Sequence, residues 1–269
     1  SQSQACAISA DGSTGVGYSI FPGELYLTAF RWTSAGGAQD LGALGVNGQS
    51  AATAASMDGS TVVGESTTSD MTARHAFRWT AAGGMVDLGT PDPLYQTLAT
   101  GVSGDGAQVI GYAYFNDKNS PNTAFIWSQA SGMTQIGGTG DEVLAITTDG
   151  SYVVGGTSPL LHPRSFAFRW SLSEGQVMLP DLPTAAFAMG RAVSSDGSIV
   201  VGNCGYVAAV WTLKNGNWTV TDLDSAYAHP ADWKLTSATG ISANGRFVVG
   251  NANSPTGQRA FVIDRGAAP

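Results

Sequence analysis

The chain has 269 residues and a net charge of −8 at pH 7, with 12 Lys and Arg against 20 Asp and Glu. This scarcity of cationic residues disfavours nucleic-acid binding and attachment to an anionic membrane surface, because both depend on clustered Lys and Arg. We also expect no direct membrane insertion, since the sequence contains no run of about 18 apolar residues.

A turn dipeptide recurs six times along the chain. The copies are Asp11-Gly12, Asp58-Gly59, Asp105-Gly106, Asp149-Gly150, Asp196-Gly197 and Asn244-Gly245, separated by 47, 47, 44, 47 and 48 residues. A period of this length is typical of repeated supersecondary units, so every motif must first be compared with its copies. Most of the recurring residues are therefore interpreted as architecture.

The second copy shows the expected elements in chain order. Short runs of small or β-branched residues lie on both sides of Asp58-Gly59, which predicts a hairpin because Asp and Gly tolerate the positive φ of a tight turn. The run 75–80 places Phe77 and Trp79 on one face of a third strand, because strand side chains alternate with period two. A fourth short strand follows the two glycines at 83–84.

Four strands in each copy and no helical periodicity predict an all-β fold. We expect a six-bladed β-propeller of four-stranded antiparallel blades, forming a single domain over residues 1–269. The last copy has no fourth strand run, so its blade should be three-stranded. A parallel β-helix or solenoid is the alternative architecture, but its repeats are usually shorter.

Several positions recur in register with the turns. A glycine lies six residues after each turn Asp or Asn, and Ser or Thr lies two residues before it. The third strands carry Trp32, Trp79, Trp127, Trp170 and Trp211, with Ile263 in the last copy. We expect these large side chains to fill the space between neighbouring blades, since they recur in the repeat.

Two further expectations come from individual side chains. Arg31 occurs with Asp40 and Arg78 with Asp87, which suggests that these opposite charges pair directly across the third and fourth strands. Cys6 and Cys204 lie in different blades, and two cysteines do not make a disulfide framework, so we expect free thiols.

One stretch of the second copy resembles a known family. It comprises Ser56-Met57-Asp58-Gly59-Ser60-Thr61-Val62-Val63-Gly64, His75-Ala76-Phe77-Arg78-Trp79-Thr80 and Gly83-Gly84-Met85-Val86-Asp87-Leu88-Gly89. The pattern is similar to the HAF-repeat family of extracellular bacterial proteins, in particular to copies in autotransporter passenger regions. The resemblance implies an extracellular or outer-membrane surface location and brings no catalytic residues with it.

The longer connections of such blades share one face, on which binding residues are expected to concentrate. We define this loop-rich face as the end of the blades that carries the loops between the second and third strands and the loops between blades. Residues there that break the repeat are our candidates for ligand binding: Tyr26, Tyr95, Tyr114, Phe115, Asp117, His162, Tyr227, His229, Asp232 and Trp233. The fifth copy shortens its loop by about six residues, so a groove is expected beside the long stretch that begins at Asp224.

The sequence favours a binding protein over an enzyme. The three histidines have no metal-ligand spacing, and no nucleophile or phosphate-loop motif is present, so we expect neither metal nor cofactor. Our leading hypothesis is a monomeric, adhesin-like surface module that binds a glycan or protein ligand. A carbohydrate-active hydrolase or lyase, which would need paired carboxylates, and a structural spacer are the alternatives.

Overall fold

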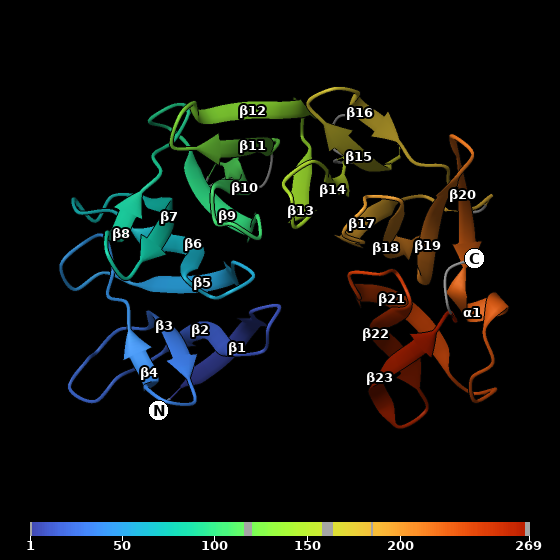
Figure 1. Cartoon of the computed structure of the whole chain (residues 1–269), viewed down its shortest axis with the longest axis horizontal. Coiled ribbons are helices and arrows are strands. Elements are labelled where there is room, and N and C mark those ends of the chain that lie inside the picture. The colour runs from blue at the N-terminus through green and yellow to red at the C-terminus, as the bar shows by residue number, and fades with distance from the viewer. Residues whose placement is uncertain (1, 116–119, 158–163, 184, 267–269) are drawn as a thin grey trace. The chain divides into compact units, whose positions relative to one another are not determined.

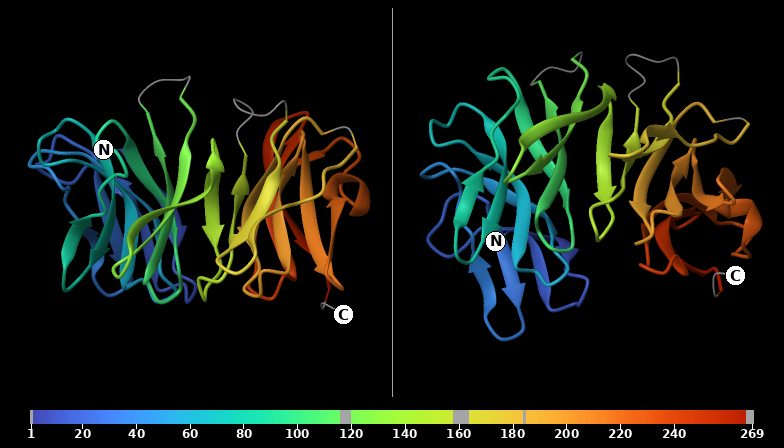
Figure 2. Two further views of the ribbon diagram at one scale, coloured as in Figure 1. Left: turned by 90° about the horizontal axis from the view of Figure 1, so that it is seen from above. Right: turned by 45° about the horizontal axis from the view of Figure 1, so that its top comes forward.

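The computed structural model describes residues 2–115, 120–157, 164–183 and 185–266 (Figure 1). These residues form 23 strands and, within the described ranges, the single helix α1 (Leu223–Ala226). The chain divides into two compact units, the first comprising 1–136 with 148–150 and the second 137–147 with 151–269. Figure 2 shows the same strands from two further directions, and the expectation of one domain stays a prediction.

The first unit contains the strands of three antiparallel blades, in which neighbouring strands follow chain order. Blade 1 consists of β1 (Ser3–Ile8), β2 (Thr14–Ser19), β3 (Thr28–Thr33) and β4 (Gly37–Asp40). Blade 2 consists of β5 (Ser50–Ala55), β6 (Thr61–Thr67), β7 (Arg74–Thr80) and β8 (Gly84–Asp87). Blade 3 consists of β9 (Gln96–Val102), β10 (Gln108–Tyr114), β11 (Thr123–Ser128) and β12 (Gly132–Thr139), whose last residues belong to the second unit.

The second unit contains the other three blades. Blade 4 consists of β13 (Glu142–Ile146), β14 (Val153–Gly156), β15 (Ala167–Ser171) and β16 (Gly175–Met178). Blade 5 consists of β17 (Ala188–Val193), β18 (Ile199–Cys204), β19 (Val207–Lys214) and β20 (Asn217–Asp222). Blade 6 has the three strands β21 (Lys234–Ile241), β22 (Phe247–Ser254) and β23 (Gly257–Asp264). The predicted fold class, a six-bladed β-propeller with a three-stranded last blade, is confirmed.

The recurring Ser-x-Asp-Gly sequence builds the turn between the first two strands of a blade. In blade 2 the Ser56 hydroxyl donates to Asp58 at 2.8 Å, and Asp58 accepts the Ser60 amide at 2.9 Å. Gly59 adopts φ 65°, which a residue with a side chain rarely takes. The connection is thus a five-residue turn closed by side chains, wider than the two-residue hairpin that Asp-Gly predicts, because Ser and Asp satisfy the backbone groups in place of strand pairing.

The glycine six residues after the turn is required by a bulge in the first strand. In blade 5, Gly190 pairs with Gly202 and Ala192 with Val201, so Arg191 between them has no partner. A Cβ atom on Gly202 would lie 1.9 Å from the Met189 carbonyl oxygen. A Cβ atom added to the equivalent glycine of any other blade would lie 1.8 to 2.1 Å from the corresponding carbonyl oxygen. These glycines are Gly17, Gly64, Gly111, Gly155 and Gly250.

Large third-strand side chains pack against the preceding blade of the same unit. Trp79 is 6% exposed and belongs to a cluster with Val16 and Leu41 of blade 1. Trp211 is fully buried against residues of blade 4, such as Val154 and Leu179. Trp32 is 44% exposed, and because blade 1 has no preceding blade in its unit, the core assignment of this residue stays a prediction.

The expected pairing of strand arginines with aspartates is also wrong. Phe77 is opposite Asp87 and Arg78 is opposite Val86, so the two charged side chains lie on different faces of the blade. Arg78 instead donates to the Gly106 carbonyl in the turn of blade 3 at 2.9 Å. Arg31 and Arg169 make the same contact with the turn carbonyls of Gly59 and Gly197, each one blade further on. These arginines join neighbouring blades within a unit.

Candidate ligand-binding groove

The groove lies on the loop-rich face of blade 5, where the connection between β18 and β19 is only Gly205 and Tyr206. Gly205 has φ 63° at the first of two turn positions, as a tight hairpin requires. Blade 1 has residues 20–27 in the corresponding connection. The groove therefore occupies the place where the sequence predicts a missing loop, beside the segment that begins at Asp224.

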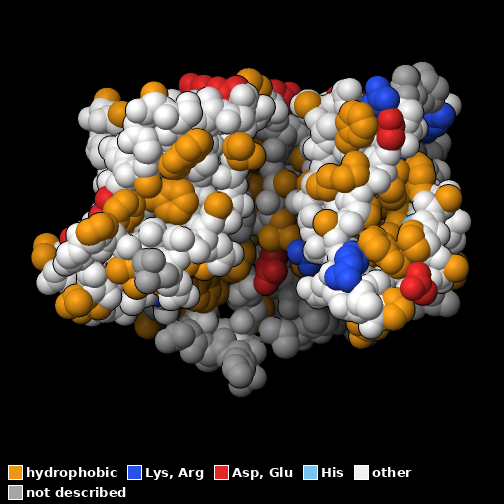
Figure 3. All heavy atoms as spheres, turned by 90° about the horizontal axis from the view of Figure 1, so that it is seen from below, with side chains coloured by type: hydrophobic (Ala, Val, Ile, Leu, Met, Phe, Trp, Pro, Cys, Tyr) orange, Lys and Arg blue, Asp and Glu red, His pale blue; other side chains and the backbone are white. Residues whose placement is uncertain are grey.

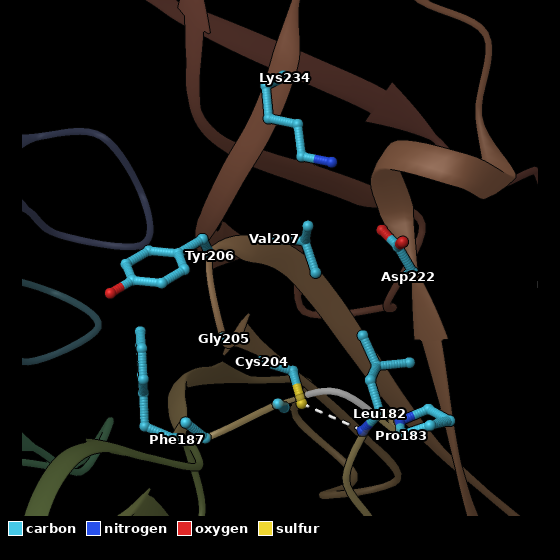
Figure 4. Close-up of a pocket in the computed structure, with 11 residues that line it drawn as sticks. Leu182, Pro183, Phe187, Cys204, Gly205, Tyr206, Val207, Asp222 and Lys234 are labelled. Atoms are coloured by element: carbon cyan, nitrogen blue, oxygen red, sulfur yellow. Dashed lines mark hydrogen bonds between the residues drawn. The ribbon is translucent and has the colours of Figure 1, made fainter.

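Two adjoining hollows make up the groove. The first has a volume of about 490 Å³ and its walls present both apolar and polar groups (Figure 4); it is lined by Leu182, Pro183, Ala185, Ala186, Phe187, Cys204, Gly205, Tyr206, Val207, Asp222 and Lys234. The second has a volume of about 380 Å³ and adds the polar residues Arg191, Asn203, Thr236, Ser237 and Asn253. Both hollows share the lining residues Phe187, Gly205, Tyr206 and Lys234, so one ligand can contact the two together.

The apolar wall comes from the segment between β16 and β17, which hydrogen bonds hold in place. The Trp211 indole N–H donates to the Pro180 carbonyl at 2.7 Å, and the Leu182 amide donates to Cys204 Sγ at 3.2 Å (Figure 4). Arg164 also donates to the Ala185 carbonyl. Because several bonds restrain this short segment, its side chains form a largely fixed surface for a ligand.

An aromatic pair lies where the two hollows meet. The rings of Phe187 and Tyr206 are 5.2 Å apart between centroids at an interplanar angle of 86°, a favourable edge-to-face arrangement. Tyr206 is 82% exposed, although tyrosine usually buries much of its ring. Phe187 thus orients a largely exposed ring, and Figure 4 shows the two side chains next to each other.

Lys234, at the start of β21, is held by the segment before it. Its ammonium group lies 2.8 Å from Asp224, which also accepts the Leu235 amide at 2.7 Å. Partial burial acts to raise the pKa of Asp224, but the hydrogen bonds from Lys234 and Leu235 outweigh it and hold that pKa below its ordinary value. Asp224 is therefore ionised at neutral pH and fixes the position of Lys234 beside the groove.

Arg191 is brought to the groove by the bulge in β17. Its Nε donates to the Asn203 amide oxygen at 3.0 Å. The equivalent bulge residues of the other blades are Cys6, Thr53, Thr100, Leu144 and Thr239. Arg191 is the only charged residue among these six positions, and a bulge is a common means of re-aiming a side chain at a binding site.

Cys204 is not activated as a nucleophile. Its side chain is 2% exposed, and burial raises the pKa of its thiol. A thiol in such surroundings stays protonated at neutral pH, whereas reactive cysteines have lowered pKa values. Cys6 and Cys204 are both free, as expected from the sequence.

Four of the sequence-predicted site residues that are described lie in the first unit. The rings of Tyr95 and Phe115 are 4.0 Å apart, and Tyr26 is 38% exposed. Tyr114 donates its hydroxyl to Glu65 at 3.3 Å; burial and the nearby Glu65 carboxylate raise the pKa of this tyrosine to about 12. These contacts give Tyr114 a structural partner within its own unit.

The other described candidates lie in the second unit, before Lys234. Tyr227 and Trp233 are partly buried against the core cluster of blades 5 and 6, and Asp232 is exposed. His229 contacts the carbonyl oxygens of Pro230 at 2.9 Å and Asp224 at 2.8 Å. Asp117 and His162 fall outside the described residues. None of the eight described candidates lines the two hollows.

Structural comparison shows the fold and sequence comparison shows no family. The chain matches TolB from Acinetobacter baumannii with a TM-score of 0.54 and 12% identity, over 96% of this chain and 65% of that one. It matches a prolyl endopeptidase with a TM-score of 0.63 and 12% identity, over 97% and 42% of the two chains. A TolB-like protein of Agrobacterium tumefaciens gives a TM-score of 0.52 and 15% identity, over 99% and 91%.

The chain thus spans less than two thirds of the first two of these proteins. At such low identities the likeness shows the β-propeller fold alone. No protein-family model matches the chain, and no curated protein matches its sequence. Within the described ranges, no helix has the length and apolar character needed to cross a membrane. Among the same residues, no three His, Cys, Asp or Glu side chains are grouped so as to hold a metal ion.

Proposed function

We propose that this chain is a monomeric binding module of the bacterial cell surface, whose groove on blade 5 takes a glycan or protein ligand. The sequence resemblance to HAF repeats suggests an autotransporter passenger with an adhesin-like role. The single observation that carries the proposal is the exposed Tyr206, held by Phe187 between two hollows of 490 and 380 Å³. Exposed aromatic rings in concave sites are frequent anchors for ligands.

Binding is favoured over hydrolysis at this groove because of its chemistry. Asp222 is the only carboxylate that lines the two hollows, among the residues described, whereas a glycosidase uses two. The neighbouring Cys204 thiol is buried and has a raised pKa, which is the opposite of what a nucleophile needs. The groove is therefore better suited to recognition than to bond cleavage.

The proposal is tested by comparing the parent chain with Tyr206→Ala on a glycan array and, by flow cytometry, on intact eukaryotic cells. Because Tyr206 is 82% exposed, the variant should melt within about 2 °C of the parent. Loss of an aromatic anchor should weaken binding at least about tenfold.

Phe247→Ala is the matched control, since Phe247 is another exposed aromatic residue and lines neither hollow. It should bind as the parent does. Equal binding by the parent and Tyr206→Ala would reject the groove as the site, and no binding to any glycan or cell would favour a structural spacer.

A further inference from the structure

The two hollows of the groove differ in chemistry, and the difference selects a ligand. Leu182, Pro183, Ala185 and Val207 give the first hollow an aliphatic wall, and Asp222 and Lys234 also line it. Carbon side chains bury favourably against the aliphatic wall, whereas a sugar hydroxyl placed there would lose hydrogen bonds to water. This wall therefore favours an aliphatic side chain over a neutral sugar ring.

The second hollow is lined by two cationic side chains in a chain that is otherwise acidic. Arg191 and Lys234 both line it, and no acidic residue is among the described residues that do so. Only 12 of 269 residues are Lys or Arg, and cationic side chains are sparse on the face drawn in Figure 3. Lys234 is already paired with Asp224, whereas Arg191 has no carboxylate partner among the described residues, so Arg191 provides a local site for an anionic group.

The geometry of Arg191 suits a carboxylate. Asn203 accepts from Nε at 3.0 Å, and no contact to a described residue engages the two terminal nitrogens. These nitrogens can donate two parallel hydrogen bonds to a carboxylate. Thr236 and Asn253 line the same hollow and add polar groups beside Arg191.

We infer that the groove binds a peptide in which a carboxylate lies next to an aliphatic side chain. The carboxylate contacts Arg191 and Lys234 in the second hollow, the aliphatic side chain enters the first, and Tyr206 packs against the peptide backbone between them. The carboxylate can come from a chain terminus or from an acidic side chain, since both present the same group. This inference rests on the proposed function and names the ligand class of the same groove.

The test uses four short labelled peptides and fluorescence anisotropy. The first, acetyl-Gly-Ser-Ala-Leu, has a free carboxyl terminus, and the second is its amide. The third, acetyl-Gly-Ser-Asp-Leu amide, carries the acid on a side chain. The fourth, acetyl-Gly-Ser-Ala-Ser with a free terminus, lacks the aliphatic group. We expect the first or third peptide to bind at least about tenfold more tightly than the second and fourth, because charged hydrogen bonds and apolar burial each contribute on that scale.

Arg191→Met keeps the length of the side chain and removes its charge, and should weaken binding of the preferred peptide at least about tenfold. Arg259→Met is the matched control, because Arg259 is an exposed arginine on β23 that lines neither hollow. Circular dichroism confirms that both variants are folded. Tightest binding by the first peptide identifies a chain terminus as the source, and tightest binding by the third identifies an acidic side chain.

Equal binding of the acid and amide peptides, or equal binding by the parent and Arg191→Met, would overturn the inference. So would Arg191-dependent binding of sialyllactose in place of every peptide, which would identify an acidic glycan. In that last case Tyr206→Ala would still weaken binding on the glycan array. The inference of a peptide ligand would then be rejected, whereas the proposed binding function of the groove would stand. Loss of the Tyr206 effect as well would reject both.

Discussion

Replacing Gly202 by alanine should be among the most damaging single-methyl changes in blade 5. The added Cβ would lie 1.9 Å from the Met189 carbonyl oxygen and 3.2 Å from the Arg191 nitrogen. An ordinary contact is about 3.5 Å, so β17 would have to move away from β18 by roughly 1.5 Å. Both contacts are backbone atoms that cannot rotate away. Loss of two or three ladder hydrogen bonds at about 1 kcal/mol each, with the overpacking itself, gives a destabilisation of about 3 to 5 kcal/mol.

The measurement is urea unfolding followed by tryptophan fluorescence, with Gly15→Ala as the matched control. Gly15 also lies in the second strand of its blade, but the nearest atom to its Cβ position is 4.0 Å away. Gly15→Ala should therefore change stability by less than about 1 kcal/mol. If Gly202→Ala unfolds at the same urea concentration as Gly15→Ala, the bulge does not require glycine and the reasoning is refuted.

Three further predictions concern single side chains. Arg169→Lys should lower stability by about 1 to 2 kcal/mol in the same urea assay, because a buried guanidinium donates to Gly197 and Glu174 and lysine cannot make both bonds; unchanged stability would contradict this. The carbonyls of Pro230 and Asp224 raise the pKa of His229 in the folded chain. The contribution of His229 to stability is therefore complete below its ordinary pKa and is lost as pH rises through its pKa in the folded chain. The melting-temperature difference between parent and His229→Gln should thus shrink between about pH 6 and pH 8, and a growing difference would reverse the argument. Iodoacetamide should modify the exposed Cys6 faster than the buried Cys204, as mass spectrometry of peptides would show. Equal rates would count against the burial of the Cys204 thiol.

The blade architecture could be predicted from sequence because each blade repeats the same local requirements. Turn residues and the bulge glycine recur, and their copies confirm one another. The arginine pairing failed because Asp87 lies opposite Phe77, one residue away from Arg78. A shift of one residue moves a side chain to the other face of a strand, and composition carries no information about such a shift.

The groove was partly predictable and its residues were not. The shortened connection of blade 5 indicates its place, since loop length is visible in the sequence. The predicted aromatics Tyr227 and Trp233 instead pack against the core, because a residue that breaks a repeat can serve packing as well as binding. Arg191 was missed, although its position five residues before Asp196 holds an uncharged residue in the other five copies. Comparison of bulge positions was the signal that could have found it.

The bulge residues also separate stability from specificity. Backbone glycine and turn residues hold each bulge, so the residue at its centre can differ from one blade to the next. Exchange of that residue alters the chemistry presented by one blade while the strand pairing around it stays the same. Arg191 is one outcome of such an exchange, and the exposed Thr239 in blade 6 offers an equivalent position at which a charged or metal-binding side chain can be introduced to give the scaffold a new ligand.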